Sequence, residues 1–255
     1  MLLAIDVGNT HTVLGLFEAD ELRAHWRVAT RKDATPDETG VLLRALFDGA
    51  GIDPGAVTGM IVSSVVPDLN EVLAKAGARH FRCDPLFVEP GVKTGLPILY
   101  ENPHEVGADR IVNAVAAVAR YGASVIVLDF GTATTLDVVG PKGEYLGGVI
   151  APGLGISAEA LFARAARLSR VPLRRPRRVI GANTEESVQS GLFHGYAALV
   201  EGLVRRVRAE LGIEAKVVAT GGLARVFEGE MPFLDAVDPG LTLEGLRMIW
   251  EKNRR

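Results

Sequence analysis

Apolar runs that end in polar turns form the main pattern of the chain. Residues 2–7 and 12–17 are two such runs on either side of the turn at residues 8–10, and residues 60–65 are a β-branched run closed by Pro67. A short continuous apolar run bounded by turn residues is typical of a buried strand. The opening of the chain is therefore predicted to be a strand hairpin, followed by a further buried strand.

Helical periodicity fills much of the sequence between the strands, most clearly where apolar residues from Ile111 to Ala119 share one face. Helices are predicted near residues 39–49, 69–75, 107–121, 155–167, 184–208 and 243–253, and later strands at residues 86–88, 145–151 and 216–219 and from Ser124. Strand hairpins followed by helices occur twice, which favours an α/β fold with mixed sheets over a uniformly parallel one. We expect two domains, residues 1–122 and 123–255.

The same phrase follows a predicted strand in each half. Asp6-Val7-Gly8-Asn9-Thr10 closes the first apolar run, and Asp129-Phe130-Gly131-Thr132 closes the run that begins the second half, 123 residues later. A strand end presents the carboxylate, the glycine lets the turn approach an anion closely, and the hydroxyls can bond phosphate oxygens. An Asp before Gly also commonly only caps a turn; the repetition favours a duplicated fold that binds a nucleotide.

Composition restricts the classes of protein. The chain has 255 residues, a formal net charge of −3 and one cysteine, Cys83. The charge argues against a globally basic nucleic-acid binder, and a single cysteine excludes an internal disulfide, which favours a reducing, cytoplasmic setting. No signal peptide is recognisable at the start, and no run of about 18 uncharged apolar residues occurs, so we expect no membrane span.

Two familiar nucleotide motifs are absent or incomplete. The sequence has no Gly-Lys dipeptide and therefore no Walker A loop. The segment Gly153-Leu154-Gly155-Ile156-Ser157-Ala158 matches the dinucleotide pattern G-x-G-x-x-A, but no acidic residue for a ribose lies about 20 positions further on. We interpret it as a tight strand-to-helix turn.

Other motifs have both a structural and a functional interpretation. Asp109 begins a helix, where it stabilises the helix dipole but could also face a substrate hydroxyl beside Arg110. Thr184 follows Asn183 in a helix-capping sequence with Glu186. Residues 164–178 hold seven arginines, which are interpreted as a solvated surface loop rather than an anion site. Thr220-Gly221-Gly222 suits a close approach of backbone to a ligand.

Together these motifs resemble the type III pantothenate kinases, in the superfamily of acetate kinase, sugar kinases, Hsp70 and actin. The matching segments run in order through the whole chain: Asp6–Thr10, Tyr100–Pro103, Gly107–Arg110, Asp129–Thr135, Gly147–Gly153, Asn183–Gly191 and Thr220–Gly222. The resemblance implies two ribonuclease H-like domains with mixed sheets flanked by helices. It also implies transfer of the ATP γ-phosphate to the 4′-hydroxyl of pantothenate, the first step of coenzyme A synthesis.

The resemblance also implies roles for residues. Asp109 would accept the proton, Asp129 would bind a monovalent cation (K⁺ or NH₄⁺) beside Mg²⁺, and the protein would be a homodimer. The ATP contacts would be Asp6, Val7, Gly8, Asn9, Thr10, His11, Thr12, Val13 and Thr132. The pantothenate contacts would be Tyr100, Gly107, Ala108, Asp109, Arg110 and Thr184. The alternatives are a sugar or carboxylic-acid kinase of the same superfamily and a non-enzymatic accessory factor for transcription.

Overall fold

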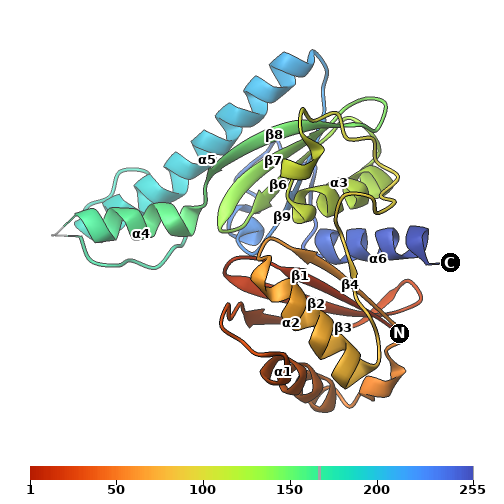
Figure 1. Cartoon of the computed structure of the whole chain (residues 1–255). Coiled ribbons are helices and arrows are strands. Elements are labelled where there is room, and N and C mark those ends of the chain that lie inside the picture. Colours follow the sequence, from red (N-terminus) through yellow and green to blue (C-terminus); the bar gives the residue numbers. More distant parts are fainter. Residues whose placement is uncertain (166–167, 255) are drawn as a thin grey trace. The chain divides into compact units, whose positions relative to one another are not determined.

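The structure is a computed structural model that describes residues 1–165 and 168–254. It forms two compact units, one of Met1–Ala116 with the segment from Gly240 onward and one of Ala117–Pro239 (Figure 1). This grouping differs from the expected division at residues 122 and 123, because the C-terminal helix joins the first unit. The division into domains 1–122 and 123–255 stays a prediction.

The first unit contains a mixed five-stranded sheet in the order β3-β2-β1-β4-β5. Its strands are β1 (Leu2–Val7), β2 (His11–Glu18), β3 (Glu21–Ala29), β4 (Gly59–Ser64) and β5 (Leu86–Phe87). The strands β1, β2 and β3 form an antiparallel meander, whereas β4 and β5 run parallel to β1. The predicted hairpin at the start of the chain is confirmed.

Helices cover both faces of this sheet. The helices α1 (Pro36–Gly49) and α2 (Asp68–Ala76) bury Phe47 and Leu73 against one face, in a core with Ile5 and Val62. The opposite face packs against α6 (Leu241–Asn253). Glycines allow this close packing, since a β-carbon at Gly15 would lie 2.8 Å from Leu243 Cδ1.

The second unit repeats the topology, with the sheet order β10-β9-β6-β7-β8. Its strands are β6 (Val125–Phe130), β7 (Ala133–Val139), β8 (Tyr145–Pro152), β9 (Lys216–Thr220) and β10 (Ala236–Val237). The central strand β6 pairs antiparallel with β7 and parallel with β9, as β1 does with β2 and β4. The predicted fold class, two duplicated mixed sheets flanked by helices, is confirmed.

The core of the second unit lies under α5 (Thr184–Leu211), which follows α4 (Leu154–Arg164). Phe130 of β6 stacks on Phe227, whose ring centroid is 5.1 Å away, and Phe193 of α5 also stacks on Phe227, with centroids 5.2 Å apart. The helix α3 (Ala108–Tyr121) begins in the first unit and its last residues belong to the second. Short turns of helix lie at Pro54–Ala56, Gly77–Phe81, Pro103–Glu105 and Ala224–Phe227.

Some predicted boundaries were wrong. The segment Glu21–Ala29 was not predicted to be a strand, because only alternate residues of this edge strand are even half-buried and its charged side chains hide the pattern. The helix α1 begins at Pro36 rather than at the predicted residue 39, because Thr35 and Glu38 form a capping box. The helix predicted at 155–167 ends at Arg164, and residues 166 and 167 lie outside the described residues.

Within residues 1–165 and 168–254, no helix has both the length and the apolar character needed to cross a membrane.

Candidate active site

The first Asp-x-Gly turn joins β1 to β2. Asp6 is the fifth residue of β1, and its backbone lies opposite Val13 on β2 and Ser63 on β4. The amide of Gly8 donates a hydrogen bond to the carbonyl of His11 at 3.0 Å, which closes the turn. The turn exposes Asn9, Thr10 and His11 to solvent, where their polar groups are accessible to an anion.

A residue that the sequence did not indicate braces this turn. Thr30, directly after β3, donates its hydroxyl to the carbonyl of Gly8 at 2.7 Å. The hydroxyl of Thr12 lies 3.0 Å from that of Thr30, and the amide of Thr30 bonds the carbonyl of Thr10 at 3.0 Å. The residue that follows the unpredicted strand β3 therefore holds the turn in place. Thr30 could have been identified from the sequence only if β3 had been recognised.

His11 sits at the solvent side of the same turn. Burial, and then the charge of Arg27, lower the pKa of His11 below its ordinary value. Arg27 Nη2 lies 3.1 Å from His11 Nδ1. Because a guanidinium only donates, Nδ1 accepts this bond and the imidazole is neutral. His11 therefore carries a neutral ring N–H, rather than a full charge, at the solvent side of the turn.

The second Asp-x-Gly turn joins β6 to β7 in the same way. Asp129 is the fifth residue of β6, opposite Thr135 on β7 and Thr220 on β9. The amide of Gly131 donates to the carbonyl of Ala133 at 3.0 Å. The two turns are thus equivalent by topology, strand position and closing hydrogen bond, as their repeated sequence predicted.

Gly153 holds the second turn from the side. Its amide donates to the carbonyl of Thr132 at 3.1 Å, and a β-carbon at this position would collide with the carbonyl of Thr132 and lie 2.6 Å from that of Gly131. Gly153 caps α4, whose first residue is Leu154. The interpretation of this glycine-rich segment as a strand-to-helix turn is confirmed, and the turn contacts the backbone of the predicted ATP residue Thr132.

The glycine-rich segment Thr220–Gly222 lies directly beside Asp129. Gly221 has φ +91°, a conformation that favours glycine, and follows the end of β9. A β-carbon there would collide with the carboxylate oxygen Oδ1 of Asp129 and lie 2.7 Å from the backbone nitrogen of Phe130. Gly221 is therefore required for β9 to end beside the second Asp-x-Gly turn.

We expect the substitution Gly221→Ala to destabilise the protein by on the order of 3 kcal/mol, because it adds both backbone strain and overlap with Phe130. Thermal unfolding measures this change. Gly202→Ala, in the middle of α5 with no atom beyond the adjacent helix backbone within 4 Å of the added methyl group, is the matched control and should be neutral or stabilising. Equal unfolding temperatures for the two variants would contradict this role of Gly221.

Buried hydroxyls tie the second turn to α5. Thr134, the second residue of β7, forms a hydrogen bond with the hydroxyl of Tyr196, and that hydroxyl donates to the carbonyl of Pro152 at 3.2 Å. Burial raises the pKa of Tyr196, so the phenol keeps its proton. The network connects β7, the end of β8 and α5, and it stabilises the segment that leads into Gly153.

The predicted acceptor motif lies at the start of α3. Asp109 is the second residue of that helix, and its carboxylate oxygen Oδ1 accepts a hydrogen bond from the amide of Arg110 at 2.9 Å. Arg110 is 8% exposed, so its charged side chain is drawn into the protein. Tyr100 lies in the preceding loop and is half-buried. The motif therefore places a carboxylate and a buried arginine next to each other at the start of α3.

Thr184 is the first residue of α5. The side chain of Asn183 caps the helix by accepting from the amide of Glu186 at 2.9 Å, as predicted. Glu186 reaches back to the amide of Ala182 at 2.8 Å, one residue earlier than a capping box requires. Thr184 does not cap the helix, and it lines a pocket of about 630 Å³ between α4 and α5.

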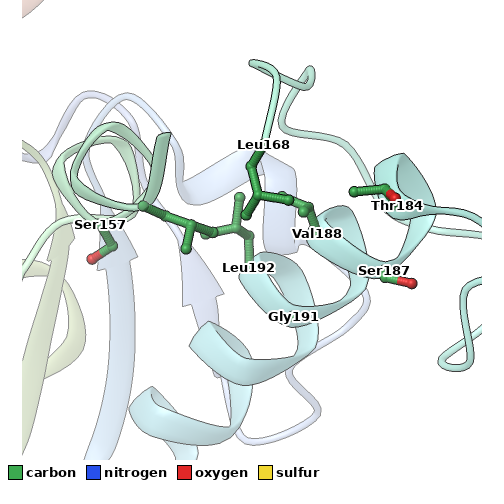
Figure 2. Close-up of a pocket in the computed structure, with 8 residues that line it drawn as sticks. Ser157, Leu168, Thr184, Ser187, Val188, Gly191 and Leu192 are labelled. Carbon is green, nitrogen blue, oxygen red and sulfur yellow. The ribbon is translucent and has the colours of Figure 1, made fainter. Parts of the chain in front are cut away.

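That pocket is apolar in the middle and polar at its ends. Figure 2 shows Ser157 at one end and Thr184 at the other, with the side chains of Leu168, Val188 and Leu192 between them. Arg174 forms an ion pair at 3.5 Å with Glu185, the residue after Thr184. The described arginines of residues 164–178 are exposed, in agreement with the expected surface position.

The predicted site residues are divided between the units. Asp6–Val13, Tyr100 and Gly107–Arg110 belong to the first unit, and Asp129, Thr132 and Thr184 to the second. In the part of the chain that the structure describes, no cluster of three or more His, Cys, Asp or Glu side chains could hold a metal ion. Single carboxylates beside hydroxyls suit a cation that also binds phosphate, because Mg²⁺ in phosphoryl-transfer sites uses one or two carboxylates, substrate oxygens and water.

Comparison with known proteins decides between the candidate families. A profile of the type III pantothenate kinase family matches residues 2–206. The chain belongs to the type III pantothenate kinase family. It is 59% identical over 253 residues to a type III pantothenate kinase of Myxococcus xanthus (strain DK1622), with 99% of each chain covered. The resemblance found in the sequence motifs is confirmed.

Solved structures show how widely the fold of this kinase family is used. A Campylobacter jejuni protein provisionally described as a Baf family transcriptional activator superposes with a TM-score of 0.62 at 18% identity, covering 98% of both chains. A Porphyromonas gingivalis protein provisionally described as an N-acetylglucosamine kinase gives 0.54 at 14% identity, covering 100% of both. At these identities the likeness shows the fold alone.

Proposed function

We propose that this protein transfers the γ-phosphate of ATP to the 4′-hydroxyl of pantothenate, giving 4′-phosphopantothenate for coenzyme A synthesis. The observation that carries the proposal is membership of the type III pantothenate kinase family over most of the chain. The duplicated Asp-x-Gly turns support it, because each follows a central strand and carries an exposed threonine, Thr10 in the first and Thr132 in the second, whose hydroxyl is of the kind that bonds phosphate oxygens.

The first turn is proposed to hold the ATP phosphates. Residues Asp6–Val13 would bind them through the amides and hydroxyls of the turn that Thr30 braces, and Thr132 would also contact the nucleotide. The carboxylate of Asp6, beside the hydroxyls of the turn, fits Mg²⁺ bound together with phosphate oxygens. When bound with the phosphates, this ion neutralises the charge that develops on their oxygens during transfer. Asp6 would orient the nucleotide through it.

The start of α3 is proposed to bind the acceptor. Asp109 would accept the proton of the 4′-hydroxyl, and Arg110, Tyr100, Gly107, Ala108 and Thr184 would contact pantothenate. A carboxylate at a helix start is a weak base. A weak base suffices because the transition state of phosphoryl transfer is loose, so the hydroxyl loses its proton late and its position matters most.

Asp129 is proposed to bind a monovalent cation, K⁺ or NH₄⁺. Its carboxylate lies so close to Gly221 that a side chain on residue 221 would collide with it. Thr135 and Thr220 lie opposite Asp129 on the adjacent strands. This oxygen-rich setting fits a hard cation. Such an ion adds positive charge beside the phosphates. We further propose that the protein is a homodimer and acts in the cytoplasm, which its single cysteine favours.

A panel of acceptors tests the proposal against its relatives of the same fold. Pantothenate, glucose, N-acetylglucosamine and acetate are each incubated with ATP, Mg²⁺ and K⁺, and ADP formation is followed. We expect turnover with pantothenate only. Phosphorylation of a sugar or of acetate without phosphorylation of pantothenate would replace the proposal with a kinase of another specificity. Salt-sensitive DNA binding without any ATP turnover would favour the regulatory alternative.

A further inference from the structure

A buried serine beside the first Asp-x-Gly turn has no partner for its hydroxyl. Ser63 on β4 has 0% of its surface exposed. Within the described residues, its Oγ forms no hydrogen bond. Burying a hydroxyl without a partner is unfavourable, so such a group usually acquires one in another state of the protein.

The register of the sheet puts this hydroxyl beside Asp6. The Cα atoms of Asp6 and Ser63 are partners on the parallel strands β1 and β4, which places their side chains on adjacent strands about 4.8 Å apart. Ile5 and Val7 flank Asp6 and contribute to the core on the other face of the sheet. Because side chains alternate along a strand, Asp6 and Ser63 share the face opposite that core.

The second unit has a hydroxyl at the equivalent position. Thr220 on β9 is the backbone partner of Asp129 on β6, just as Ser63 on β4 is the partner of Asp6 on β1. Thr220 is also buried, with 1% exposed. The duplicated fold therefore places a buried hydroxyl next to each of the two strand-end carboxylates.

We propose that Ser63 is a positioning residue for Asp6. When the nucleotide binds with Mg²⁺, the Ser63 hydroxyl rotates and donates a hydrogen bond to the Asp6 carboxylate, which fixes the orientation of that carboxylate toward the metal-bound phosphates. A carboxylate has acceptor sites enough for this bond in addition to its other contacts. The inference rests on the proposed role of Asp6 in binding ATP.

A packing role is the competing explanation. The same sheet face carries small residues where α6 approaches, including Ala4, Gly15 and Gly59, and a serine there could serve only as another small side chain. The two explanations differ in what the hydroxyl does. A packing role does not depend on nucleotide or metal, whereas the positioning role does.

The neighbouring serine provides a matched control. Ser64 follows on the other face, and its hydroxyl donates to the carbonyl of Val66 at 3.1 Å and accepts from the amide of Val66 at 3.1 Å. Ser64→Ala removes these bonds and should lower the unfolding temperature without changing nucleotide affinity. Ser63→Ala removes a hydroxyl with no bond to lose, so it should leave the unfolding temperature of the ligand-free protein unchanged or raised.

The decisive readout is ATP binding to the full chain by calorimetry, with and without Mg²⁺. For Ser63→Ala we expect affinity to fall on the order of tenfold with Mg²⁺, the effect of one hydrogen bond to a charged group, and to change less than about twofold without it. Unchanged affinity with Mg²⁺ overturns the inference and leaves the packing role. Binding needs no acceptor, so a wild-type protein that binds ATP but does not phosphorylate pantothenate would refute the proposed function and not this inference.

Discussion

Asp109→Asn is expected to lower kcat for pantothenate phosphorylation by about 10²–10⁴-fold while the affinity for ATP stays near that of the wild type. The side-chain amide of the asparagine cannot accept the proton of the 4′-hydroxyl. Its oxygen can still accept the hydrogen bond that the backbone N–H of Arg110 donates to Asp109 Oδ1 in the wild type, so the start of α3 is preserved. Steady-state kinetics and ATP calorimetry measure the two effects separately.

The control for Asp109 is an acid at another helix start. Asp68 lies in the first turn of α2, and Asp68→Asn removes a similar charge from a helix dipole without touching the proposed acceptor site. We expect its kcat to match the wild type. If Asp109→Asn phosphorylates pantothenate at close to the wild-type rate, Asp109 is not the proton acceptor.

Asp129→Ala is expected to remove most of the activation by K⁺ together with most of the activity. The substitution deletes the carboxylate proposed to bind the cation and leaves the backbone pairing of Asp129 with Thr135 and Thr220 in place. Activity is measured against K⁺ concentration, with choline chloride holding the ionic strength constant.

Asp137→Asn is unsuitable as a control for Asp129, because Asp137 is buried and accepts hydrogen bonds from Tyr145 and Thr135. Asp235→Ala is preferable, since Asp235 is partly exposed in the same unit and lies outside the Asp-x-Gly turn. Asp235 accepts a bond from the amide of Val217, so some loss of stability is expected while K⁺ activation is kept. An Asp129→Ala protein with unaltered K⁺ activation would place the cation elsewhere.

The sequence predicted the parts of the fold whose signal is local. Continuous apolar strands such as β1 and β6 and the repeated Asp-x-Gly turns were recognisable, and with them the duplication. The edge strand β3 was missed because its burial depends on pairing with β2, a contact distant from its own composition. The packing of α6 on the first sheet is likewise set by residues more than 170 positions away, so the sequence could not assign that helix to a unit.

The residues of the candidate site also fall into two groups, those with a local sequence signal and those without one. Asp6, Asp109 and Asp129 were indicated by short motifs, whose residue types carry the chemistry. Thr30 and Ser63 carried no such signal, because they contact or face the first turn only through strand pairing. The constraint on Gly221 also emerged only with the backbone of Phe130 beside it.

We expect this member of the kinase family to phosphorylate the 4′-hydroxyl of pantothenate. The most direct measurement is identification of the product after incubation with ATP, pantothenate, Mg²⁺ and K⁺, by mass spectrometry and phosphorus NMR, with a parallel reaction lacking K⁺. We expect 4′-phosphopantothenate and ADP in equal amounts, with much less of both when K⁺ is omitted. ATP consumption without 4′-phosphopantothenate, or no reaction under any of these conditions, would contradict it.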